Sequence, residues 1–150
     1  MPVQRASILL AKFMIVAIWS AVLTIIIFVA GLVMGALIKL PGGSIAVLLQ
    51  GSELVMITAC LAIAVVPPFA LFASLGRGYL LPVGLAVLTM MATNLMAILG
   101  WGDFFPWAVP GLYAQGKTAL APASYWIVIL TALAGMLATY LWWMRADQSR

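Results

Sequence analysis

Long apolar stretches, separated by isolated charged residues, dominate the chain. The charge-free stretches run over residues 13–38, 54–76, 78–102 and 118–144. A helix needs about 20 residues to cross about 30 Å of hydrocarbon, so each stretch predicts one membrane-spanning helix. The predicted spans cover residues 14–37, 53–74, 80–100 and 124–143.

Two shorter charge-free segments, 40–52 and 104–116, are too short to cross a bilayer. Turn residues interrupt both of them, with Pro41-Gly42-Gly43 in the first and Pro106 and Pro110-Gly111 in the second. We expect interfacial or re-entrant pieces here. Residues 101–123, which include the second segment, then form a long outer loop before the last span.

The start of the second span depends on where a helix breaks between residues 45 and 73. One continuous helix over this range would be about 43 Å long, more than the hydrocarbon core needs without strong tilt. A break at Gly51-Ser52 is the simpler interpretation. Ser52 would then cap a new helix and Glu53 would lie in its first turn, where a carboxylate suits the helix dipole.

Composition supports the membrane interpretation. Hydrophobic residues make up 67% of the 150 residues and charged residues only 7%, whereas a soluble domain carries about 25% charged residues. The predicted fold is an all-α membrane protein with four transmembrane helices, an interfacial segment and a long outer loop. The net charge of +4 is small and lies at span ends, which favours a topology signal over nucleic-acid binding.

The distribution of Lys and Arg predicts the orientation. The side that would hold both termini carries Arg5, Lys12, Arg77, Arg145 and Arg150, and the other side carries Lys39 and Lys117. Because cytoplasmic loops carry the excess of basic residues, both termini are expected in the cytoplasm. The predicted location is the inner (plasma) membrane, which the chain crosses several times.

Glycine and proline mark two features inside the spans. Gly31 and Gly35 form a G-x-x-x-G motif on the first span, which permits close helix packing. Pro67 and Pro68 free carbonyl groups one turn back and predict a kink in the second span. That kink is either static or a hinge that lets the end of the helix swing.

Four polar residues in or near the spans are candidates for a pathway or a proton-linked role. Glu53 is either an interfacial cap or a substrate- or proton-linked group, and Gln50, one turn before it, could share either role. Thr93 and Asn94 form a polar pair in the third span. They either make hydrogen bonds between helices or line a transport path.

Residues for catalysis are missing. The chain has no His and a single Cys60, so it has no Ser-His or Cys-His pair, no paired carboxylates in one span and no metal cluster. It also has no G-x-x-x-x-G-K-[ST] loop for nucleotide hydrolysis. We therefore expect neither an enzyme nor a metal site.

Three segments resemble the permease subunits of type-2 ABC exporters, in the bacitracin and lantibiotic self-protection branch. The segment FALFASLGRGYLLPVG resembles a span end, an intracellular turn and the re-entry through L-x-P. FFPWAVPGLY is similar to an element before the last span, and LPGGS is similar to a turn after an earlier one. They occupy residues 69–84, 104–113 and 40–44.

The resemblance implies a permease that works with a second permease copy and with ABC ATP-binding subunits. The partner ATPase would bind ATP and Mg, so this chain would bind no cofactor. The family usually has six spans, and the four spans here resemble its last four. The opening MPVQRASILLAKF resembles the cytoplasmic segment before the third span. The residues expected to face the ATPase are Pro2, Arg5, Gly76, Arg77 and Gly78.

Two other functions fit the sequence. A small proton-coupled multidrug exporter, acting as a homodimer, would centre on one membrane carboxylate such as Glu53. A non-transporting accessory membrane protein would need neither an ATPase partner nor a substrate. The exporter permease, moving an amphipathic or peptide-like substrate, is the function that the sequence favours.

Overall fold

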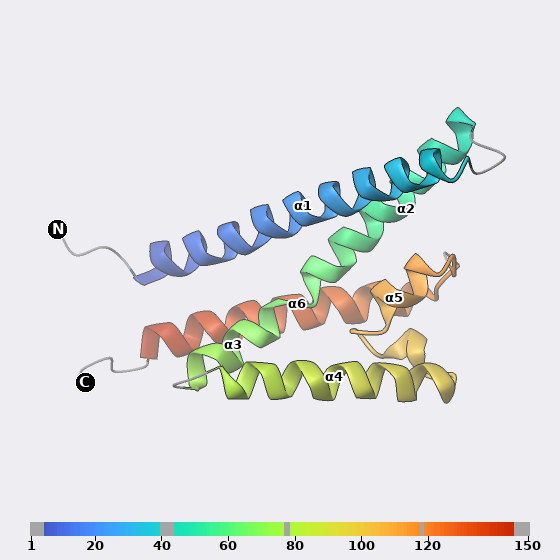
Figure 1. The fold of residues 1–150 in the computed structure, drawn as a ribbon. Coiled ribbons are helices and arrows are strands. Elements are labelled where there is room, and N and C mark those ends of the chain that lie inside the picture. The colour runs from blue at the N-terminus through green and yellow to red at the C-terminus, as the bar shows by residue number, and fades with distance from the viewer. Residues whose placement is uncertain (1–4, 40–43, 77–78, 118, 146–150) are drawn as a thin grey trace.

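The computed structural model describes residues 5–39, 44–76, 79–117 and 119–145. Its ordered elements in these ranges are all helical (Figure 1). The elements are α1 (Arg5–Leu37), α2 (Ile45–Ala64), α3 (Pro67–Leu75), α4 (Leu80–Ile98), the 3₁₀ helix η1 (Gly102–Phe104), α5 (Val109–Ala114) and α6 (Pro122–Arg145).

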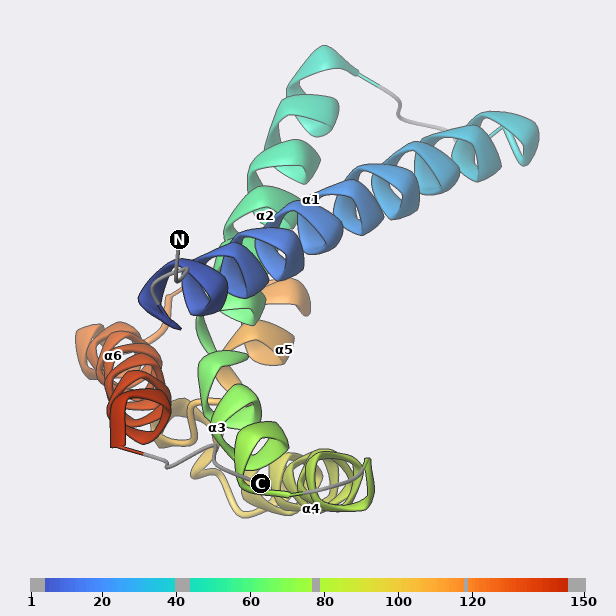
Figure 2. The same cartoon turned by 90° about the vertical axis from the view of Figure 1, so that its left-hand side faces the viewer.

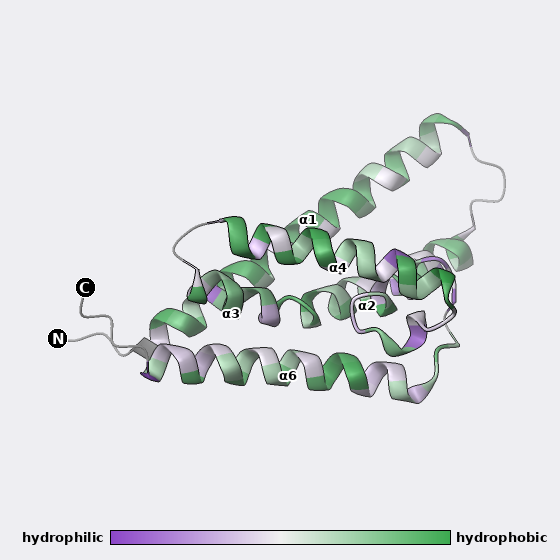
Figure 3. Ribbon diagram, turned by 90° about the horizontal axis from the view of Figure 1, so that it is seen from below, coloured by the Kyte–Doolittle hydropathy of each residue, from purple (hydrophilic) through white to green (hydrophobic). Residues whose placement is uncertain are grey.

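The predicted all-α membrane fold is confirmed. Four helical segments are long and apolar enough to cross a bilayer: 6–37, 45–75, 80–98 and 122–145. The long helices are coloured mostly as hydrophobic along their length (Figure 3). They run back and forth along one direction, so that α1 begins and α6 ends at the same end of the molecule (Figure 1).

The first helix is longer than its predicted span. Helix α1 is continuous from Arg5 to Leu37, which corresponds to about 50 Å. The segment before the predicted span therefore forms the first turns of the same helix from Arg5 onward. Since the hydrocarbon core is about 30 Å thick, the charged first turns can extend beyond it.

The predicted break at Gly51-Ser52 is wrong. Helix α2 continues through both residues and is capped earlier, where the Ser44 side chain accepts a hydrogen bond from the Val47 amide at 3.3 Å. The Ser52 hydroxyl donates to the Leu49 carbonyl at 2.8 Å instead of capping a new helix. Glu53 therefore lies in the third turn of α2, not in a first turn.

The second span is interrupted further along, at Val65 and Val66. Helix α2 ends at Ala64 and α3 begins at Pro67. Pro67 and Pro68 have no amide hydrogen to donate to the preceding turn, so the regular hydrogen-bond ladder cannot continue there. The structure thus has an interruption where the proline pair predicts a kink.

The loop before the last span provides much of the buried core. Val109 and Tyr113 of α5 lie between α2 and α6, in a cluster with Val65, Leu120 and Val128. The cluster is extended by partly buried side chains of the second span and the loop. The loop therefore returns among the helices and does not merely face outward.

Helix α3 lies between two of the long helices. Viewed along the helices, α3 is between α6 and α4, and α1 crosses in front of α2 (Figure 2). Helix α3 packs against α6 and α4, and α1 packs against α2 and α6. Most side chains of α1 and α4 are exposed in this single chain, as expected for helices that contact lipid or another protein.

One ion pair, between Lys117 and Asp103, lies within the loop before the last span. The Lys117 amine lies 2.7 Å from a carboxylate oxygen of Asp103, and the two side chains are 52% and 24% exposed. Pairs this exposed contribute about 0.2–1 kcal/mol to stability.

We expect Asp103→Asn to lower the thermal unfolding temperature of the detergent-solubilised protein only slightly, with the difference disappearing at high salt. A loss of several kcal/mol would contradict this.

Candidate functional site

A cavity of about 560 Å³ lies beside α3, between that helix and α1, α4 and α6. We call it the Lys12 cavity, after the one charged residue among its described lining residues. It is lined by Leu9, Lys12, Phe13, Ile15, Val16, Val66, Phe69, Ala70, Ala73, Ser74, Pro82, Thr139 and Trp143. Its size falls in the range of about 300–1,000 Å³ that is typical of small-molecule sites.

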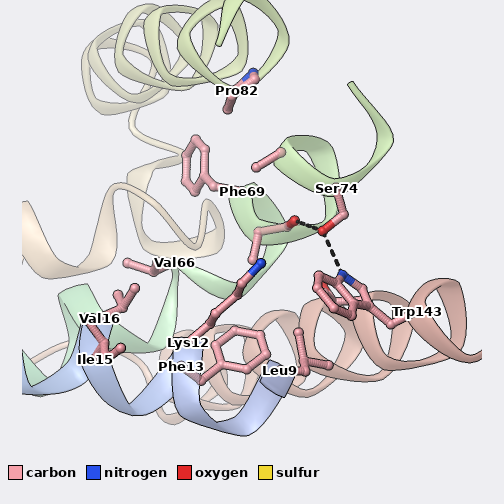
Figure 4. A pocket seen from close by; sticks show the side chains of 13 residues that line it. Leu9, Lys12, Phe13, Ile15, Val16, Val66, Phe69, Ser74, Pro82 and Trp143 are labelled. Carbon is pink, nitrogen blue, oxygen red and sulfur yellow. Dashed lines mark hydrogen bonds between the residues drawn. The ribbon is translucent and has the colours of Figure 1, made fainter. Parts of the chain in front are cut away.

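Lys12 reaches from α1 into this cavity (Figure 4). Its amine lies 4.5 Å from the centre of the Trp143 ring, a cation–π contact between α1 and α6. The indole N–H of Trp143 donates to the Ser74 hydroxyl at 3.0 Å, and that hydroxyl donates to the Ala70 carbonyl at 2.8 Å (Figure 4). The three helices are thereby linked at one end of the cavity.

The interruption of the second span borders the same cavity. The carbonyl of Val65 accepts no hydrogen bond from Phe69, whose amide bonds to Val66 instead at 2.9 Å. The indole N–H of Trp107, from the outer loop, donates to the Val65 carbonyl at 3.2 Å. A loop residue therefore pairs with a backbone carbonyl that lacks its regular helical donor at the interruption.

Gly135 of α6 is where the last span approaches the interruption most closely. A Cβ atom built on Gly135 would lie 2.5 Å from the Pro68 nitrogen and 2.8 Å from the Pro67 carbonyl carbon. One turn further on, the buried Thr139 donates to the Gly135 carbonyl at 2.7 Å. Only glycine allows the two backbones to lie this close.

A second hollow, of about 320 Å³, lies beside α4 and is lined by Phe69, Ala86, Thr89, Met90, Thr93, Asn94 and Trp107. We call it the α4 hollow. Thr93 donates to the Thr89 carbonyl at 2.7 Å and Asn94 to the Met90 carbonyl at 2.9 Å. These bonds lie within α4 and do not join helices. The role of the pair on a pathway remains a prediction.

Phe69 lines both hollows and packs edge-on against Trp107, with ring centres 6.1 Å apart. Phe105 also contacts Trp107, at 5.5 Å between ring centres. Phe69 therefore borders both the Lys12 cavity and the α4 hollow.

Other candidates lie away from these spaces. Gln50 and Glu53 are exposed on α2 and line neither hollow. Nothing lies within 4 Å of a Cβ built on Gly31 or Gly35, so packing through this motif would need a partner chain. A pathway, proton-linked or packing role for these four residues stays a prediction.

Of the residues predicted to face an ATPase, the structure describes Arg5 and Gly76. Gly76 ends α3, where its amide donates to the Phe72 carbonyl at 3.1 Å. Arg5 is the first residue of α1. Pro2, Arg77 and Gly78 lie outside the described residues.

Three important residues were not predicted from the sequence. Gly135 and Thr139 follow the small-x-x-x-small spacing that favours close helix packing, so this signal was present. Lys12 was interpreted only as a topology charge, since nothing local indicated that it faces a cavity. In the described part of the chain, no three His, Cys, Asp or Glu side chains lie close enough together to bind a metal ion.

Comparisons with known proteins agree with the resemblance seen in the sequence. Residues 1–93 match a family described as "ABC-2 family transporter protein". The chain is also similar to the bacitracin transport permease protein BCRB of Bacillus licheniformis. The two are 27% identical over 149 residues, which are 97% of this chain and 72% of the relative. No solved structure gives a significant match. Since the family match covers more than half of a multi-helix apolar chain, the protein belongs to the ABC-2 family of transporter permeases.

Proposed function

We propose that the chain is the membrane-spanning permease of an ATP-driven exporter. A separate ABC ATPase subunit would bind ATP and Mg, and a second permease copy would complete the transporter. The observation that carries this proposal is the match of residues 1–93 to the ABC-2 family. The similarity to a bacitracin transport permease favours an amphipathic or peptide-like substrate.

The interrupted second span supports a mechanism for the coupling. Helix α3 is short and begins at the proline pair, and it supplies four of the residues that line the Lys12 cavity: Phe69, Ala70, Ala73 and Ser74. Val66, just before α3, also lines it. If the ATPase moves the segment after Gly76, α3 can pivot about Val65 and Val66. The pivot would change the cavity, while Phe69 would move relative to the α4 hollow. Pro67 and Pro68 are the proposed hinge.

The test is transport in inside-out membrane vesicles that contain the chain and its ATPase. We expect ATP-dependent uptake of a fluorescent cyclic peptide antibiotic, and we expect the ATPase to co-purify with the tagged chain. Both termini, labelled at single introduced cysteines in a Cys60→Ala background, should react only from the cytoplasmic side. An ATPase that fails to co-purify, together with uptake that needs no ATP, would refute the proposal.

Glu53 provides a test against proton coupling. It lies exposed in the third turn of α2, outside both hollows. We therefore expect Glu53→Gln to leave ATP-driven uptake within about twofold of wild type, since a surface substitution away from a site changes free energies by about 0.5 kcal/mol or less. Gln50→Ala is the neighbouring control. A proton-coupled exporter would be favoured if a pH gradient drove uptake without ATP and if Glu53→Gln abolished that uptake.

A further inference from the structure

The polar groups of the Lys12 cavity, apart from Lys12 itself, have partners within the protein. The Ser74 hydroxyl is bonded to the Ala70 carbonyl and the Trp143 indole, and the Thr139 hydroxyl is bonded to the Gly135 carbonyl. Most of the other lining residues are aliphatic or aromatic. The cavity therefore offers one positive charge at the edge of an apolar space.

The charge of Lys12 has no carboxylate partner among the described residues. Asp103 pairs with Lys117 in the outer loop, and Glu53 lies exposed on α2. The Lys12 amine lies 4.5 Å from the centre of the Trp143 ring and interacts with the π face of that ring. The amine has three N–H donors. It can therefore still donate a hydrogen bond to an anion. Lys12 is exposed at the edge of the apolar space, so its amine is accessible to an anionic ligand.

The position of Lys12 along α1 indicates what kind of anion this is. Lys12 is seven residues after the first residue of α1, about 10 Å along the helix. With α1 about 50 Å long and the hydrocarbon about 30 Å thick, this is close to the level of the lipid headgroups. The apolar residues of the cavity, such as Phe13 and Val16, continue from Lys12 along α1 towards the bilayer centre.

We propose that the Lys12 cavity binds one anionic phospholipid. Lys12 binds the headgroup phosphate, and an acyl chain occupies the apolar space between α1, α3 and α6. A free phosphate would leave that apolar lining unused, whereas basic pockets between membrane helices commonly take lipid headgroups. Because α3 forms one wall, the bound lipid also contacts the helix that follows the interruption. The proposed lipid site depends only on the membrane fold. The proposal therefore applies whether or not the chain transports a substrate.

The experiment is native mass spectrometry of the full chain from detergent micelles that contain equal amounts of phosphatidylglycerol and phosphatidylcholine with identical acyl chains. We expect one phosphatidylglycerol to be retained in preference to phosphatidylcholine. Lys12→Gln should lower that preference about fivefold, the effect of one basic residue near an anionic headgroup. Lys39→Gln is the matched control, because it removes one lysine from the turn that follows the opposite end of α1 and should retain the preference.

A second variant tests the apolar part of the site while keeping Lys12. Ala73 lines the cavity and is exposed to it, so Ala73→Phe should fill part of the space and lower lipid retention. Circular dichroism and gel filtration check that each variant is folded. Three results would overturn the proposal. Lys12→Gln could retain the wild-type preference for phosphatidylglycerol, Lys39→Gln could lose that preference as much as Lys12→Gln does, or inorganic phosphate could displace the bound lipid. Since no ATPase is present, these results are independent of the proposed export.

Discussion

Replacing Gly135 with alanine is expected to loosen the contact between α6 and the interruption of the second span. The added Cβ would lie 2.5 Å from the Pro68 nitrogen and 2.7 Å from its Cδ atom. Two of the three nearest atoms belong to the backbone, so no flexible side chain can move aside. Overpacking of this kind costs about 1–3 kcal/mol, and we expect a lower thermal unfolding temperature in detergent.

The same substitution elsewhere in the chain serves as the control. Nothing lies within 4 Å of a Cβ on Gly31 or Gly35, and alanine is more favourable than glycine inside a helix by about 1 kcal/mol. Gly31→Ala and Gly35→Ala should therefore leave the isolated chain as stable as wild type, or make it more stable. If Gly135→Ala behaves in the same way as these two, the close contact at Pro68 does not exist.

The contrast between these glycines shows why sequence predicts spans better than it predicts contacts. Four spans follow from charge-free length alone, because lipid excludes unpaired charges and requires about 20 apolar residues. Whether a glycine packs depends on which helix lies opposite. Gly31 and Gly35 carry the more familiar spacing, but no atom of another described segment lies within 4 Å of a Cβ built on either of them. A Cβ on Gly135 would meet two proline residues.

The two candidate breaks in the second span illustrate a second limit. The rules of soluble helices, in which glycine and serine favour helix ends, predict a break at Gly51-Ser52. In an apolar environment no water competes for the backbone, and Ser52 satisfies its hydroxyl on the Leu49 carbonyl without ending the helix. The proline pair is different, because it removes the amide donors themselves.

The outer loop could be predicted as long and aromatic, but not as part of the core. Its prolines and aromatic residues are equally typical of an interfacial segment. Burial of Val109 and Tyr113 arises from the space left between α2 and α6, which only the packing of distant segments defines. The link from Trp107 to Val65 spans 42 residues, so no local pattern indicates it.

Trp107 is accordingly the second position at which a large effect is expected. Its indole donates to the freed Val65 carbonyl at 3.2 Å and its ring contacts Phe69 and Phe105. Trp107→Ala removes both the bond and the packing. Such truncations cost about 3–5 kcal/mol when the side chain is fully buried, and because Trp107 is half-buried we expect a loss near or below the lower end of that range. Trp107→Phe retains most of the ring contact but leaves the carbonyl unpaired, at a cost of about 1–3 kcal/mol.

Amide hydrogen exchange can show which helices are destabilised in the Trp107 variants. If Trp107 holds the interruption in place, the amides of α3, from Phe69 to Leu75, should exchange faster in both variants, and more so in Trp107→Ala. Amides at the centre of α1 should be unchanged, because Trp107 does not contact that helix. Trp126→Ala is the matched control, since Trp126 is 64% exposed on α6. Equal effects of Trp107→Ala and Trp126→Ala on α3 would mean that the loop does not restrain the hinge, and that the motion proposed for transport is limited by Gly135 alone.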